Sequence, residues 1–110
     1  MVSVQGTTIS MTKGDTAKIL LTLSYYNDTP YKPDEGDSIR FALKKNYTDA
    51  RTLIKIDIPV ESPYILHIKP ADTKKLSCGT YKYDIQLTKA DGTVDTFIDR
   101  ATLVLTEEIE

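Results

Sequence analysis

Few residues in this sequence could do acid–base or metal chemistry, and their spacing does not assemble a site. His67 is the only histidine, and it alternates with Leu66 and Ile68 as an outward-facing strand residue would. Zinc needs several converging ligands, and nucleophilic catalysis needs a base beside the nucleophile. We therefore expect no catalytic residue, no metal and no cofactor.

Three carboxylates gather in segment 34–37 (DEGD), which offers oxygen ligands of the kind that calcium takes. The spacing matches no calcium-binding loop, and Gly36 close behind Pro33 is typical of a solvated turn. Only this loop and His67 suggest an enzyme. We therefore favour an enzymatic function less than a structural or a binding function. Cys78 is the single cysteine, so an internal disulfide is excluded, and we expect its thiol to be a small packing residue.

Tyrosines collect around two expected loops. Tyr26, Tyr31 and Tyr47 lie in or beside the loops around the second and third strands. Tyrosine is favoured at protein interfaces and on sugar-binding faces, so these three form the predicted contact surface. The alternative is that they only cap the end of the domain.

The elements that must position these residues have a period of two, which is the period of a half-buried strand. Such segments are 19–25, 39–44, 54–58, 64–69 and 81–87. Segment 90–93 (ADGT) predicts a hairpin turn after the last of them. Beyond it, the apolar positions are even from Val94 to Ile98 and odd from Ala101 to Leu105, which predicts a β-bulge near Asp99 and Arg100.

The remaining segments complete a sandwich. Segment 7–12 is predicted to be a short edge strand, and 70–76 a connector that could begin with one helical turn. Tyr81, shortly after Leu76, is predicted to form a tyrosine corner. The fold class is therefore all-β, an immunoglobulin-like antiparallel β-sandwich of about seven to eight strands, in one domain over residues 1–110. The absence of tryptophan and of a cysteine pair makes it immunoglobulin-like at most.

Charge and hydropathy exclude several classes of partner. The net charge of −2, with acids and bases interspersed, gives no basic stripe for nucleic acid or anionic lipid. No apolar run could span a bilayer, and no signal peptide is visible at the N-terminus, so the cytoplasm is the default location. We expect neither a nucleic-acid partner nor a membrane.

A family resemblance rests on turn residues and core positions. The segments that carry it are 11–16 (MTKGDT), 37–43 (DSIRFAL), 66–73 (LHIKPADT), Leu76, 79–85 (GTYKYDI) and 91–96 (DGTVDT). Together they resemble the N-terminal domain of phage baseplate upper proteins and related prophage tail proteins, over nearly the whole chain. Fold does not fix function, so no functional residue is carried over.

The resemblance implies a non-enzymatic tail or baseplate structural protein that acts in assembly through protein–protein contacts. Its partners would be other phage structural proteins and further copies of itself, as a homo-oligomer. It would be made in the cytoplasm of a bacterial host and then reside in the virion. In the phage proteins further chain leads to a receptor-binding part, whereas this sequence ends at Glu110, so we expect a spacer or adaptor. The alternative is a carbohydrate-binding or adhesion module on the same kind of sandwich.

Overall fold

Strands make up nearly all the regular structure of the chain. The computed structural model describes residues 2–5, 7–21, 33–61 and 63–107. In chain order the elements are β1 (Val2–Gln5), β2 (Thr8–Thr12), β3 (Ala17–Leu21), β4 (Ser38–Lys44), β5 (Ile54–Ile58), β6 (Tyr64–Ile68), α1 (Pro70–Thr73), β7 (Gly79–Thr88) and β8 (Val94–Thr106). No helix in the described ranges is long and apolar enough to cross a membrane.

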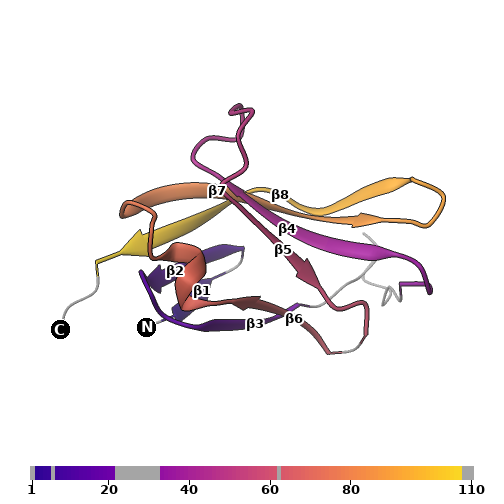
Figure 1. Ribbon diagram of the computed structural model, residues 1–110, viewed down its shortest axis with the longest axis horizontal. Helices are drawn as coiled ribbons and strands as arrows, with labels where there is room; N and C mark the ends of the chain where they lie inside the picture. Colours follow the sequence, from indigo (N-terminus) through magenta and orange to yellow (C-terminus); the bar gives the residue numbers. More distant parts are fainter. Residues whose placement is uncertain (1, 6, 22–32, 62, 108–110) are drawn as a thin grey trace.

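The strands form two sheets that lie one above the other (Figure 1). The larger has the order β1-β2-β8-β7-β4-β5, and the smaller pairs β3 with β6. This arrangement confirms the all-β, immunoglobulin-like sandwich. Neighbouring strands are antiparallel except β2 and β8, which are parallel. The prediction of an antiparallel sandwich is therefore wrong at this one pairing, where strands from the two ends of the chain meet.

Alternation along the strands places the core between the sheets, because successive side chains point to opposite faces. On β4, Ile39, Phe41 and Leu43 are buried as predicted, and Leu66 and Ile68 are buried on β6. The inward residues of β7 are Tyr81, Tyr83, Ile85 and Leu87, all at most 4% exposed. Phe41 packs against Tyr83 with 5.2 Å between ring centroids.

The hairpin of β7 and β8 is confirmed. Gly92 has a φ of 93°, which favours glycine, and its N–H donates to the carbonyl of Lys89. The bulge is also confirmed, because the register of β7 against β8 shifts around Asp84. Arg100 lies at this irregularity with a φ of 54°, the one non-glycine residue with positive φ among the described residues.

Three smaller predictions have different outcomes. The tyrosine corner is confirmed, since the Tyr81 hydroxyl donates to the carbonyl of Ser77. The connector does begin with one helical turn, α1, and the buried Thr73 hydroxyl accepts a 2.9 Å bond from the Gly14 N–H. The edge-strand prediction is wrong: β2 lies between β1 and β8, because β1 pairs with its other side.

Candidate binding site

Tyr47 is the member of the predicted tyrosine surface that the structure describes. Tyr26 and Tyr31 lie outside the described residues. Tyr47 is 54% exposed, a high value for a large apolar side chain. It belongs to the loop between β4 and β5, which rises from the outer face of the six-stranded sheet (Figure 1). The described part of the predicted surface is therefore on the side of this sheet that faces away from the core.

A reciprocal pair of hydrogen bonds fixes the turn that carries Tyr47. The Asn46 N–H donates to Oδ2 of Asp49 over 3.1 Å, and the Asp49 N–H donates back to the Asn46 carbonyl over 3.0 Å. Asparagine and aspartate favour such turns because a short side chain can replace a backbone partner. Leu53 then donates to the Leu43 carbonyl over 2.8 Å and closes the base of the loop. The ring is thus held by a structured turn.

The β-bulge supplies the second half of the site. A bulge inserts a residue into one strand and redirects the side chains around it. Here the guanidinium carbon of Arg100 lies 4.9 Å from the centroid of the Tyr47 ring, in a cation–π contact. A left-handed conformation at a residue other than glycine is strained, and such strain is found most often at functional sites. The bulge and the loop therefore meet above the sheet.

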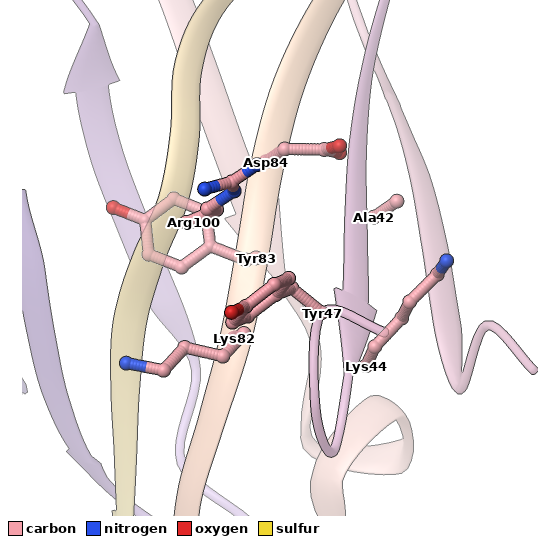
Figure 2. Close-up of a pocket in the computed structure, with 7 residues that line it drawn as sticks. All are labelled: Ala42, Lys44, Tyr47, Lys82, Tyr83, Asp84 and Arg100. Carbon is pink, nitrogen blue, oxygen red and sulfur yellow. The ribbon is translucent and has the colours of Figure 1, made fainter. Parts of the chain in front are cut away.

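Between them lies an open pocket of about 220 Å³, which we call the Tyr47 pocket. Figure 2 shows the side chains of β4, β7 and β8 around Tyr47, with Lys44 and Lys82 on opposite sides of the ring. Its lining residues are Ala42, Lys44, Tyr47, Lys82, Tyr83, Asp84 and Arg100. Ala42 is a small residue between larger neighbours on β4, and this difference in side-chain length contributes to the hollow.

The lining is cationic although the whole chain has a net charge of −2. Among the described residues that line it, Lys44, Lys82 and Arg100 are cationic and Asp84 is acidic. Lys44 lies opposite Lys82 in the register of β4 and β7, and the two side chains extend to opposite sides of Tyr47 (Figure 2). Lys82 donates to the Thr102 hydroxyl over 2.8 Å. The pocket is consequently a local concentration of positive charge.

Next to the pocket, a polar chain crosses the same face. Arg40 donates from Nη2 to the Gln86 side-chain oxygen over 3.0 Å, and Gln86 donates weakly to Oδ2 of Asp84 over 3.4 Å. Nε of Arg40 and Oδ1 of Asp84 are buried without a hydrogen-bond partner. An unsatisfied buried polar atom is unfavourable, so this network is incompletely paired in the chain by itself.

Tyr83 closes the pocket from the core side. Its hydroxyl donates to the carbonyl of Thr7, and burial raises its pKa above the usual value of 10.0. Tyr81 also has a raised pKa, chiefly because of burial and secondarily because of the nearby Cys78 thiol. Both tyrosines are neutral hydrogen-bond donors at neutral pH, so Tyr83, which lines the pocket, adds no charge to it.

The other candidates do not join this pocket. In the acidic loop, the Asp34 N–H donates to Oδ2 of Asp37, and Lys89 approaches the same oxygen at 3.7 Å, so the loop is a hydrogen-bonded turn. His67 is half-buried on β6, where it pairs with Lys18 of β3 in the smaller sheet and not in the sheet that carries the pocket. The described ranges contain no cluster of side chains suited to a metal. Cys78 is exposed, so the expectation that it packs in the interior is wrong.

Three of the pocket residues come from strands whose faces the sequence predicted correctly. Lys44, Lys82 and Asp84 occupy outward positions of β4 and β7, but alternation alone does not say which outward residues gather around a hollow. Arg100 was within reach of sequence reasoning, because the change of inward face near it predicted the bulge. The contact of Arg100 with Tyr47 could not be predicted from the sequence, since the direction of the loop depends on the turn at Asn46.

Comparison with known proteins supports the fold. The structure is similar to that of the fibronectin(III)-like modules of Clostridium thermocellum CbhA, with a TM-score of 0.53 and 12% sequence identity over 98% of this chain and 96% of the other. No protein-family model and no curated protein sequence matches the chain. At this level of identity the similarity extends to the architecture alone, and the chain is an immunoglobulin-like, all-β module.

Proposed function

We propose that the chain is a non-enzymatic structural module of a phage or prophage tail, which assembles through contacts with further copies of itself and with other phage structural proteins. The resemblance of its turn and core residues to baseplate upper proteins supports this role. An immunoglobulin-like sandwich is also a suitable scaffold for presenting a contact surface. The observation that carries the proposal lies on the smaller sheet.

The outward face of the smaller sheet has an apolar pair, in which Leu20 is exposed and Ile65 is half-buried. Leu20 on β3 is 68% exposed, the highest value among the exposed large apolar side chains of the described residues. Its cross-strand partner is Ile65 on β6, so the two side chains share the face that points away from the core. An exposed leucine beside a second apolar side chain on a two-stranded sheet is a favourable place for a protein contact.

The edge of β3 adds backbone hydrogen-bonding groups to this surface. Among the described strands β3 pairs with β6 alone, so its other side has no described partner strand. Such edges accept a strand from another chain. A second copy can pair β3 with β3 around a twofold axis, which would bring the two Leu20 side chains into one contact. We therefore assign this edge to self-association.

The mass of the protein in solution tests the proposal. Light scattering across a concentration series is expected to give a defined multimer, and Leu20→Lys is expected to dissociate it because a charge at the edge disfavours strand pairing. Val94→Lys is the matched control, since Val94 is 52% exposed on the distant hairpin. A monomer at every concentration would contradict self-association, and failure to co-purify with identified tail proteins from a phage lysate would contradict the tail role.

A carbohydrate-binding or adhesion module is the second candidate, and the Tyr47 pocket favours it. An exposed aromatic ring beside polar side chains is a common arrangement for holding a sugar. Binding on a glycan array that Tyr47→Ala abolishes would support this function. Tyr26→Ala and Tyr31→Ala extend the test to the rest of the predicted surface, and a blank array would remove the candidate.

A further inference from the structure

We infer that the Tyr47 pocket binds an acidic saccharide, through its carboxylate and one face of its ring. The inference specifies the ligand class of the second candidate function and does not depend on self-association. It is argued from the charge, the shape and the unsatisfied polar groups of the pocket.

The charge of the pocket selects an anionic group. Lys44 and Lys82 are neighbours in the register of β4 and β7 and extend to either side of Tyr47, and Arg100 lies over the Tyr47 ring. A carboxylate bound beside the ring would be attracted by all three cations, since opposite charges a few ångströms apart attract even near a protein surface. The chain as a whole is acidic, so non-specific attraction of anions does not account for the site.

The ring of Tyr47 selects a ligand with an apolar face. Arg100 lies over the ring, yet the side chain remains 54% exposed, so ring surface is left for a second contact. The aliphatic C–H face of a sugar ring can pack on an aromatic ring in this way. A free inorganic anion has no such face, so the pocket would bind it through charge alone.

The polar network next to the pocket selects hydroxyl groups. One oxygen of Asp84 accepts only a weak 3.4 Å bond from Gln86, and the other has no partner. A carboxylate accepts hydrogen bonds and donates none when ionised. Rotation of this half-buried side chain toward the pocket would offer an acceptor to a sugar hydroxyl. A ligand that carries both a carboxylate and hydroxyl donors therefore complements the lysines and the aspartate together.

The volume of the pocket limits the length of the ligand that it encloses. About 220 Å³ accommodates one sugar residue, and the pocket is open, so neighbouring residues of an oligosaccharide can extend into solvent. A single small polar site of this kind gives weak binding, which multivalent display in an assembly would strengthen.

Titration of the isotopically labelled protein tests the inference. The probes are galacturonate, glucuronate and mannuronate disaccharides, and their methyl esters are the matched neutral controls. Backbone amide shifts are expected near Tyr47 and Arg100 with the acids and not with the esters. The affinity should fall as sodium chloride is raised, because salt screens exposed charges.

Variants separate the contributions within the pocket. Tyr47→Ala is expected to weaken binding about tenfold, whereas Tyr47→Phe should retain it. Lys44→Gln is expected to weaken binding about two- to fivefold, and Lys18→Gln on the opposite sheet is the matched control with no effect.

Several outcomes would overturn the inference. Equal binding of the methyl esters would show a site for neutral sugars, and no shift with any of the acids would show no saccharide site. Equal shifts with a glutamate-containing peptide would assign the pocket to an acidic protein segment instead. None of these outcomes changes the mass in solution, so they are distinguishable from failure of the assembly role.

Discussion

The two faces of β7 differ in how completely their side chains are paired. On the inner face Tyr83 and Ile85 are almost completely buried, and the Tyr83 hydroxyl has a backbone partner. On the outer face, one residue away, Lys82 and Asp84 are only half-buried, and Asp84 has an oxygen without a hydrogen-bond partner. The inner face can be explained by the fold alone, whereas the outer face has charges and unsatisfied groups that the fold does not require. This difference separates the residues that stabilise the sandwich from those available for binding.

The largest expected effect tests the inner face. Phe41→Ala removes a ring with no exposed surface and is expected to lower the free energy of unfolding by about 3–5 kcal/mol. Urea denaturation measures the change. Lys44→Gln, at an outward position of the same strand, is expected to change it by less than about 0.5 kcal/mol. Similar losses for both variants would contradict the division between the faces.

A second effect separates the Tyr83 hydroxyl from its ring. Tyr83→Phe is expected to destabilise the protein by about 1–2 kcal/mol at neutral pH, because the Thr7 carbonyl loses its donor. Burial raises the pKa of Tyr83 in the folded state, so the neutral form is the one that folding favours. Its contribution is complete below the unfolded pKa of about 10 and is lost as the pH rises through the folded pKa.

Urea denaturation at neutral pH and above pH 10 checks the direction of this pH dependence. The difference in stability between the natural protein and Tyr83→Phe should shrink at alkaline pH. A difference that grew with pH would mean that the folded state favours the ionised hydroxyl, which would contradict its placement on the inner face.

A third prediction concerns the bulge, where the two faces exchange. Arg100→Gly is expected to be more stable than Arg100→Ala by about 1 kcal/mol, because glycine adopts a positive φ without strain. Because both variants lack the guanidinium, the difference between their free energies of unfolding reports the cost of the positive φ alone. At Thr102, in regular strand, the order should reverse, with alanine more stable than glycine. Denaturation curves of the four variants make the test.

The smallest effect is expected at Cys78. Its side chain is exposed, so Cys78→Ser should change the free energy of unfolding by less than about 0.5 kcal/mol. The thiol of the folded protein should also react with a thiol reagent without prior unfolding. Slow reaction together with a large loss of stability would instead place this residue in the core.

The inner face was predictable from sequence to a useful extent, and the pocket was not. A period of two identifies which residues of a strand face inward, and it located Phe41, Leu66 and the bulge before Ala101. It does not identify the neighbouring strand, so β2 was expected at an edge and its parallel partner β8 was missed. Burial is a property of single strands, but pairing depends on contacts between distant segments.

The Tyr47 pocket depends on three segments at once, which explains why sequence pattern revealed only parts of it. The type of residue made Tyr47 a candidate for the contact surface. The change of periodicity predicted the bulge near Arg100. Their contact requires the turn at Asn46–Asp49 and the register of β4 against β7. The expectation for Cys78 failed for a related reason, since a small residue beside glycine is equally compatible with an exposed turn.

The parallel pairing of β2 with β8 has a consequence for how the chain folds during synthesis. Ile9 lies beside Leu103 and Met11 beside Leu105, so the contact closes a loop of more than 90 residues. Closing so long a loop slows folding, because its entropy is lost before the contact forms. On the ribosome, β2 would wait until β8 has emerged, and we expect its exposed edge to need protection from premature pairing.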